Sequence, residues 1–137
     1  MTWSTTASGP FGMRYIPSGF VFETKGSMCF TSKQLLPYLL GLYNTPVIQS
    51  FLQMVSPTSD YHEGPLGKTP VIIKPNEKKE KLVEKNINLS RNDWDSFETS
   101  WDFQRHPLIR KVPTIAEAFD QWQAECEDRF QQLKANE

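Results

Sequence analysis

The chain has 137 residues, of which 38% are hydrophobic, with four Trp, four Tyr, nine Phe, ten Pro and a net charge of −1. This length and apolar content allow one domain with a packed core that needs no disulfide framework or structural metal, and they exclude an intrinsically disordered chain. The near-neutral charge gives the chain as a whole no electrostatic preference for nucleic acid.

Charge is distributed unevenly along the chain. Residues 1–74 carry five Lys or Arg against three Asp or Glu, whereas residues 75–137 carry ten against thirteen. Any surface that faces phosphate groups is therefore expected in the first half.

The sequence shows no sign of secretion or of a membrane span. No apolar run reaches the roughly 18 residues needed to cross a bilayer, and the first six residues lack the basic and apolar regions of a signal peptide. Cys29 and Cys126 lie in hydrophobic patterns and are interpreted as reduced core residues. We expect a cytoplasmic chain without a membrane partner.

In chain order, a loop comes first, because the opening residues are rich in Ser, Thr, Gly and Pro. Residues 19–23 and 27–30 then predict two short strands. The connection over residues 24–26 is short enough for a hairpin.

Two apolar helices are predicted next. Ser32 can cap the first helix, although Pro37 favours a start nearer to itself. Thr45 and Pro46 fit the N-cap and the first position of the second helix. The apolar positions of the two helices are Leu35, Leu36, Leu39, Leu40 and Tyr43, then Val47, Ile48, Phe51, Leu52 and Val55. This spacing predicts a pair of helices packed on the sheet.

The middle of the chain predicts one more strand and two helical segments. Residues 71–73 predict a short buried strand, and residues 78–85 predict the beginning of a helix with mixed charges. Ser90 and Asp93 resemble a capping box with Asp in place of Glu, which predicts another helix starting there.

The helix predicted from Ser90 would hold Trp94, Phe97 and Trp101 on one face. At this spacing aromatic residues usually belong to a core, and we expect Trp101 to be buried. Stacking on nucleic-acid bases is the alternative interpretation.

The clearest helix follows a capping box formed by Thr114 and Glu117. Its apolar positions approximate a heptad repeat, so the helix can pack against another long helix. This seam comprises Ile115, Phe119, Trp122, Cys126, Phe130 and Leu133.

Together these elements predict an α+β fold, in which a small β-sheet with two short apolar helices is followed by a helical spacer that ends in a long amphipathic helix. The first part covers residues 1–74 and the second covers residues 75–137.

Residues that could carry chemistry are sparse. Asp60 and the run Glu77-Lys78-Lys79 formally supply the carboxylates and the lysine of a nuclease that cleaves phosphodiesters with a metal ion. That reaction needs carboxylates fixed on adjoining strands around the metal, whereas Glu77 is predicted to begin a helix. His62 and His106 have no cluster of further ligands, so neither a zinc site nor a catalytic base is expected.

The most distinctive segment spans residues 90–108, where Trp94, Phe97, Trp101 and Phe103 stand among many charges. It reads Ser-Arg-Asn-Asp-Trp-Asp-Ser-Phe-Glu-Thr-Ser-Trp-Asp-Phe-Gln-Arg-His-Pro-Leu. This segment resembles part of the large adenine-specific DNA methyltransferases of the PglX type, from the BREX and phage-growth-limitation defence systems of bacteria.

The resemblance extends in both directions. Residues 2–4, 11–22 and 25–30 look like the start of the target-recognition region of that family, and residues 133–137 look like the beginning of a longer helix. We therefore expect nearly the whole chain to be covered, as a fragment of a much larger enzyme.

The family's reaction is methyl transfer from S-adenosylmethionine to N6 of adenine, which marks self DNA in a restriction-modification type of phage defence. The chain lacks the Asn/Asp-Pro-Pro-Tyr/Phe tetrapeptide, and no hydrophobic strand precedes the glycine pair of Gly9-Pro10-Phe11-Gly12. We expect no catalytic, cofactor-binding or metal-binding residue in this chain, with S-adenosylmethionine bound by the parent enzyme.

The resemblance also implies that residues 1–74 form part of a DNA target-recognition lobe for double-stranded DNA and that residues 75–137 connect it to a distal helical domain. Lys25 is the best candidate contact, at the tip of the predicted hairpin beside Gly26. The full set of candidates on turns or beside glycines comprises Arg14, Lys25, Lys33, Tyr61, His62 and Lys68. Residues 64–71 resemble the Gly-Asp-Ile-x-x-Leu-Pro-Ile turn that ends a recognition lobe, with Pro65 in place of the acid.

An interaction module is the rival interpretation. In that case the seam of the last helix binds another helix, by self-association or by docking to the rest of the methyltransferase, without any DNA contact.

Overall fold

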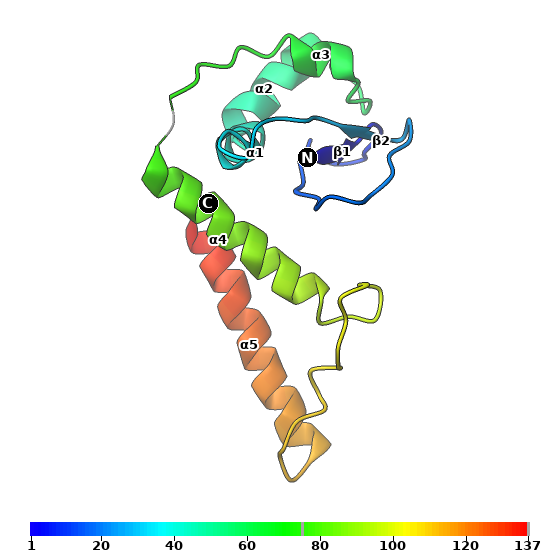
Figure 1. Ribbon diagram of the computed structural model, residues 1–137, viewed down its shortest axis with the longest axis vertical. Coiled ribbons are helices and arrows are strands. Elements are labelled where there is room, and N and C mark those ends of the chain that lie inside the picture. The colour runs from blue at the N-terminus through cyan, green and yellow to red at the C-terminus, as the bar shows by residue number, and fades with distance from the viewer. Residues whose placement is uncertain (75, 137) are drawn as a thin grey trace. The chain divides into compact units, whose positions relative to one another are not determined.

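A computed structural model describes residues 1–74 and 76–136. The chain divides into two compact units, Met1–Val83 and Glu84–Glu137. The described residues form a mixed fold with two strands and five helices, of which the last is the longest (Figure 1). This confirms the predicted α+β class. No helix in this part of the chain combines the length and the apolar character needed to cross a bilayer.

The first unit contains a two-stranded sheet whose strands come from distant parts of the chain. β1 (Thr2–Ser4) pairs with β2 (Gly26–Met28) in an antiparallel register that places Trp3 opposite Ser27. An isolated bridge also joins Thr2 to Arg14. The backbone of Thr2 therefore has pairing partners on both sides.

The predicted hairpin is wrong. Residues 19–23 form no strand, and the opening segment, predicted as a loop, supplies the partner of β2. Burial explains the difference, because β1 places Trp3 in the core at 4% exposure, whereas Val21 is 97% exposed. A strand-like pattern does not show which segment a strand will pair with, since pairing depends on the packing of side chains from elsewhere.

Trp3 and Tyr61 lie at the centre of the core of the first unit. The indole N–H of Trp3 donates to the carbonyl oxygen of Tyr61 at 2.8 Å. The Phe11 ring packs against both side chains, with ring centroids 6.2 Å from Trp3 and 5.3 Å from Tyr61. The buried hydrophobic residues of this unit are Met1, Trp3, Phe11, Met13, Leu40, Ile48, Leu52, Tyr61 and Leu66.

Two helices follow the sheet. α1 (Leu36–Tyr43) carries Pro37 in its first turn, where proline removes no helical hydrogen bond, so the start favoured by Pro37 is confirmed. α2 (Pro46–Val55) begins as predicted, and the Thr45 hydroxyl accepts a hydrogen bond from the Ile48 amide.

The Asn44 side chain connects the end of α1 to the loop between β1 and β2. Its Nδ2 donates to the carbonyl oxygens of Met13 and Leu40, at 2.9 and 2.8 Å. Its Oδ1 accepts from the Met13 amide at 3.0 Å. One side chain therefore satisfies three backbone groups that would otherwise need other partners.

α3 (Glu63–Gly67) leads into residues 71–73, which form no strand. Ile72 is 72% exposed and Ile73 is 56% exposed, so the predicted buried strand is wrong. The segment is held in another way, because the Tyr38 hydroxyl donates to the Ile72 carbonyl oxygen at 2.6 Å. A run of three apolar residues cannot become a buried strand when no other strand is available to pair with it.

α4 (Glu77–Trp94) confirms the helix predicted from residues 78–85 and continues to Trp94. Ser90 therefore lies inside a helix, and the predicted capping box is wrong. Residues 95–102 form turns and bends instead of a further helix. The predicted burial of Trp101 is also wrong, since its side chain is 96% exposed.

In the second unit, α5 (Ile115–Asn136) runs antiparallel to the last part of α4 (Figure 1). Asn136 Nδ2 donates to Asn86 Oδ1 at 2.6 Å near one end of the pair. The start of α5 is confirmed, because the Thr114 hydroxyl accepts from the Glu117 amide at 3.1 Å.

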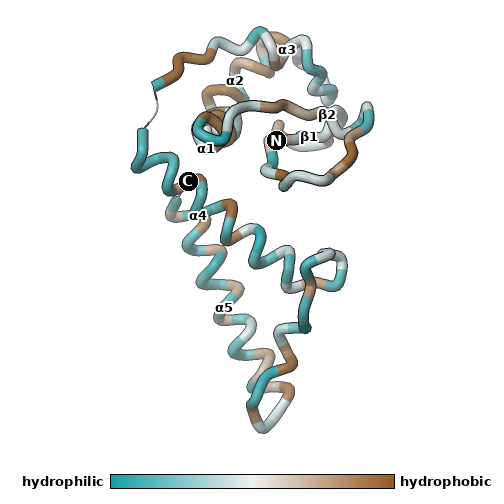
Figure 2. Tube along the Cα trace, in the orientation of Figure 1, coloured by the Kyte–Doolittle hydropathy of each residue, from teal (hydrophilic) through white to brown (hydrophobic). Residues whose placement is uncertain are grey.

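The predicted seam of α5 is covered only in part. Trp122 and Cys126 are half-buried, and the Trp122 ring lies 6.4 Å from the Phe97 ring. In contrast, Ile115 is 80% exposed and Phe130 is 58% exposed. Both long helices are mostly hydrophilic (Figure 2), which leaves few apolar groups to bury.

Candidate nucleic-acid interface

Five of the six predicted DNA contacts have exposed side chains in the first unit, namely Arg14, Lys25, Lys33, His62 and Lys68. Tyr61 differs, because only 7% of it is exposed and its hydroxyl donates to the Gly9 carbonyl oxygen at 3.3 Å. The expectation that Tyr61 reaches outward is therefore wrong. Its aromatic ring is part of the core.

Lys25 lies in the turn that leads into β2, not at a hairpin tip. Its amide donates to Glu23 Oε1 at 2.9 Å, and its carbonyl oxygen accepts from the Thr5 amide at 3.2 Å. The Thr5 hydroxyl donates to the same carbonyl oxygen at 3.3 Å. These bonds fix the backbone and leave the ammonium group exposed.

His62 lies close to the same part of the sheet. The Tyr61 amide donates to the Thr5 carbonyl oxygen at 2.6 Å, so residue 5 lies between the backbones of Lys25 and Tyr61. His62 follows directly and occupies the N-cap position of α3. The structure therefore places Lys25 and His62 on the two backbone segments that flank residue 5.

Glu63 is a second acidic neighbour of this region, besides Glu23. Its carboxylate accepts a hydrogen bond from the Ser27 hydroxyl. This bond lowers the pKa of Glu63 below its ordinary value of 4.5, with smaller lowering contributions from a backbone hydrogen bond and from His62. Ser27 is buried at 4% exposure, so the bond also satisfies a buried hydroxyl in β2.

The other candidate cations lie on different elements. Arg14 pairs with the opposite side of β1, where its amide and carbonyl both bond to Thr2, at 2.8 and 2.9 Å. Lys33 lies before α1, and Lys68 occupies the C-cap position of α3. The hydrogen bonds of this unit therefore link the segments of Lys25 and His62 through residue 5. Arg14, Lys33 and Lys68 lie on other segments.

The segment that resembles a lobe-ending turn is built around Leu66, which is 4% exposed. Its carbonyl oxygen accepts from the Tyr43 hydroxyl at 3.4 Å, and burial raises the pKa of Tyr43 above its ordinary value of 10.0. The apolar position of the predicted turn thus has the structural role that its sequence suggested.

No group of three or more potential metal ligands occurs within residues 1–74 and 76–136. His106 serves a structural role, because its Nδ1 accepts from the Leu108 amide at 3.2 Å and its ring lies 5.8 Å from that of Trp122. Both cysteines are free and half-buried.

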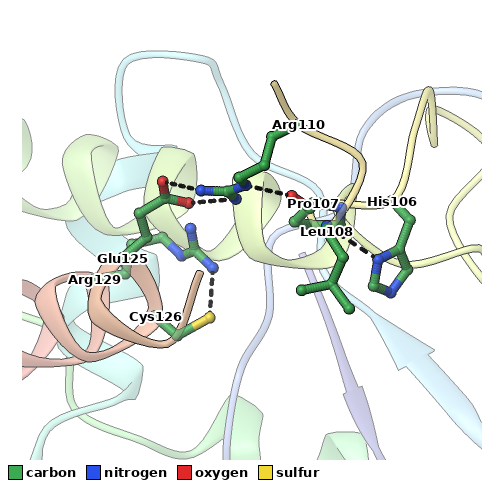
Figure 3. A network of polar contacts seen from close by, with 7 residues as sticks. All are labelled: His106, Pro107, Leu108, Arg110, Glu125, Cys126 and Arg129. Atoms are coloured by element: carbon green, nitrogen blue, oxygen red, sulfur yellow. Dashed lines mark hydrogen bonds and ion pairs between the residues drawn. The ribbon is translucent and has the colours of Figure 1, made fainter. Parts of the chain in front are cut away.

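The second unit contains a polar network that sequence patterns did not indicate (Figure 3). Arg110 donates to both carboxylate oxygens of Glu125, at 2.8 and 3.1 Å. Arg129 Nη2 contacts Asp93 Oδ1 at 3.3 Å and Cys126 Sγ at 3.1 Å. These contacts attach the loop between the long helices to α5 and join α5 to α4.

No known family profile matches the chain. Two curated proteins do match it. The chain is 40% identical over 144 aligned positions to the adenine-specific methyltransferase PglX of Lacticaseibacillus casei (strain Zhang), and this match covers 100% of the chain and 12% of PglX. The chain matches a PglX-type segment. It is also 35% identical over 121 positions to the adenine-specific methyltransferase BrxX of Escherichia coli O9:H4 (strain HS), covering 86% of the chain and 10% of BrxX.

These matches confirm the predicted resemblance to PglX-type methyltransferases. The chain spans only about a tenth of the length of the curated relatives it matches. Its similarity extends over both units, since the match to PglX includes the entire chain.

Proposed function

We propose that this chain contributes to DNA target recognition in an adenine-specific DNA N6-methyltransferase that takes part in phage defence in the cytoplasm. The similarity of the whole chain to PglX carries this proposal. Residues 1–74 would form part of the recognition lobe for double-stranded DNA, and residues 75–137 would connect that lobe to a distal helical domain.

The residues of the chain do not fit S-adenosylmethionine. A glycine-rich loop that binds such a cofactor joins a strand directly to a helix, so that the helix N-terminus faces the ligand. Here the glycine pair at Gly9 and Gly12 is followed by non-helical backbone, and the first helix begins only at Leu36. Methyl transfer from S-adenosylmethionine is therefore assigned to parts of the enzyme outside this segment.

Exposed cations in the first unit support the DNA-facing role. Lys25, Lys33 and Lys68 present ammonium groups on turns or at helix ends. His62 follows Tyr61, whose backbone is linked to that of Lys25 through residue 5. Such groups contact phosphates and position a protein on a duplex without reading its sequence. Glu23 and Glu63 lie close to Lys25 and His62, so we expect weak binding by the isolated chain.

The test is fluorescence anisotropy with a labelled duplex of about 30 base pairs at two salt concentrations. Lys25→Glu combined with Lys68→Glu should weaken binding by about tenfold or more at low salt for every sequence tried, and should flatten the salt dependence. Lys78→Glu combined with Lys79→Glu is the matched control, because it reverses the same charge on exposed positions of α4. Equal affinity of the two double variants would refute the assignment.

Catalysis provides a second check. The purified chain should transfer no labelled methyl group from S-adenosylmethionine to duplex DNA, because the tetrapeptide and the cofactor loop are missing from its sequence. Incorporation above a no-protein control would show that the chemistry resides in this segment after all.

A second candidate function is helix-mediated association, favoured by exposed apolar groups on α5. Ile115, Phe119 and Phe130 are 80%, 47% and 58% exposed. Light scattering after size exclusion should then show self-association that Phe130→Ala together with Ile115→Ala abolishes. A monomer at every concentration would leave docking to another part of the methyltransferase as the remaining form of this function.

A further inference from the structure

The turn after α4, residues 95–103, presents an indole ring almost completely to solvent. Trp101 is 96% exposed, more than any other tryptophan in the described part of the chain. Full exposure of tryptophan is uncommon in folded proteins, because this side chain carries a large apolar area. Exposure to water therefore gives no energetic reason for a tryptophan at residue 101.

Hydrogen bonds fix the backbone of this turn. Ser100 is buried at 8% exposure, and its hydroxyl donates to Asp95 Oδ1 at 2.6 Å and accepts from the Asp102 amide at 3.1 Å. The Ser100 amide and carbonyl bond to Phe97 and Phe103, at 3.0 and 3.3 Å. The residues on both sides of Trp101 are therefore held in place.

The turn is also anchored to α5. The Phe97 ring packs edge-on against the Trp122 ring, with centroids 6.4 Å apart. A large aromatic side chain on a backbone that is already ordered loses little conformational entropy when it binds. This combination is typical of the residues that dominate the energy of protein interfaces.

The negative charge around Trp101 favours a protein partner over a nucleic acid. Residues 93–102 contain four acids, Asp93, Asp95, Glu98 and Asp102, and no Lys or Arg. Arg129 partly neutralises Asp93, whereas Glu98 and Asp102 are exposed. An acidic border repels the phosphates of a nucleic acid and attracts Lys or Arg side chains of a protein.

We propose that the Trp101 turn docks into a folded protein surface that presents an apolar pocket bordered by Lys or Arg. Resting on the proposed function, we assign that surface to the remainder of the methyltransferase, because the chain covers only 12% of its PglX relative. Trp101 fills the pocket, and Glu98 and Asp102 pair with the cations around it.

The first experiment places this chain in a full-length protein. The matched segment of Lacticaseibacillus casei PglX is replaced by this chain, and hydroxyl-radical footprinting compares Trp101 in the chimera and in the isolated chain. We expect oxidation of Trp101 to fall at least about tenfold in the chimera without DNA. Equal oxidation in both proteins overturns the proposal, and so does protection that appears only after DNA is added.

The second experiment measures docking between separate molecules. The labelled chain is titrated with Lacticaseibacillus casei PglX that lacks its own matched segment, and anisotropy reports binding. Trp101→Ala should weaken binding at least about 30-fold, the range of a dominant interface residue. Phe30→Ala is the matched control, since it removes another exposed aromatic ring outside both the turn and α5. Absence of binding by the unaltered chain, or equal binding by Trp101→Ala, overturns the proposal.

Charge variants and nucleic-acid probes separate the possible outcomes. Glu98→Lys combined with Asp102→Lys should weaken docking and remove its salt dependence. A single-stranded oligothymidine should bind equally to the chain and to Trp101→Ala, and a selective loss in that variant would establish base stacking instead. The Lys25→Glu and Lys68→Glu double variant should dock normally, so failure of the proposed DNA contacts remains distinguishable from failure of docking.

Discussion

Arg110 binds Glu125 through two nearly equivalent hydrogen bonds, from Nη1 to Oε1 at 2.8 Å and from Nη2 to Oε2 at 3.1 Å. A third bond, from Arg110 Nε to the Pro107 carbonyl oxygen at 2.7 Å, orients the guanidinium group. A planar guanidinium matches a carboxylate in this geometry, and lysine cannot reproduce it. The pair therefore fixes the loop before α5 against the helix.

Removing this pair should loosen the loop. Glu125→Gln should speed amide exchange of residues 106–112 about two- to fivefold at pH 7, the range expected for a partly exposed ion pair. Glu77→Gln is the control, because it breaks the pair with Lys81 in which both side chains are at least 70% exposed. Unchanged exchange in Glu125→Gln would show that the pair does not hold the loop.

Acid should release the same contact. The hydrogen bonds from Arg110 lower the pKa of Glu125 below its ordinary value of 4.5. The stabilisation by this pair is therefore complete above the pKa that Glu125 has in the unfolded chain. It is lost as the pH falls through the lower pKa that Glu125 has in the folded chain. Exchange in residues 106–112 of the unaltered chain should approach that of Glu125→Gln only below about pH 4.5. Convergence of the two proteins near neutral pH would contradict this sign.

Ser27 and Glu63 provide a second test by pH. Ser27→Ala removes the main hydrogen bond that lowers the pKa of Glu63, so that pKa should rise toward 4.5. An NMR titration of the Glu63 carboxyl carbon measures it directly. Ser27→Thr keeps a hydroxyl and should retain a lowered pKa. A Glu63 pKa that is identical in Ser27→Ala and the unaltered chain would show that another group causes the shift.

The two tryptophans Trp3 and Trp101 should respond oppositely to truncation. Trp3→Ala removes a core ring and leaves the Tyr61 carbonyl without its indole partner, and should cost about 3–5 kcal/mol of unfolding free energy. Trp101→Ala should stay within about 0.5 kcal/mol, as is usual for surface positions. Urea denaturation followed by far-UV circular dichroism measures both. A large loss for Trp101→Ala would restore the core assignment predicted from its helical spacing.

Asn44 should be more important for stability than its exposure suggests. Asn44→Ala removes three hydrogen bonds to the backbone of Met13 and Leu40, and we expect a loss of about 1–3 kcal/mol. Asn88→Ala is the control, because it replaces an exposed asparagine in the middle of α4. Equal denaturation midpoints for the two variants would show that solvent replaces the Asn44 bonds.

Local signals in the sequence were predictive where a single residue decides the structure. Thr45 and Pro46 mark the start of α2, and Thr114 marks the start of α5, because a side-chain cap acts only on the first turn that follows it. Ser90 shows the limit of such signals. Its spacing from Asp93 matches a capping box, but a Ser in the middle of a continuous helix has no free amide groups to cap.

Features that depend on distant residues could not be predicted. The partner of β2 is the segment around Trp3, and nothing near residues 26–28 indicates this. Of the candidate contacts, only Tyr61 lacks the exposure expected of it, because its burial depends on Phe11 and Gly9, which lie about fifty residues earlier in the sequence. The exposed lysines were easier to place, since long charged side chains remain at the surface in most folds.

The hydrogen bond from Trp3 to Tyr61 spans 58 residues of sequence. It therefore determines when the first unit can fold during synthesis. β1 precedes α1 and α2 in the sequence, so its side-chain and backbone partners near residue 61 leave the ribosome only after both helices have been translated. Because contacts of long sequence separation form slowly, we expect the two helices to form first and the sheet to close last.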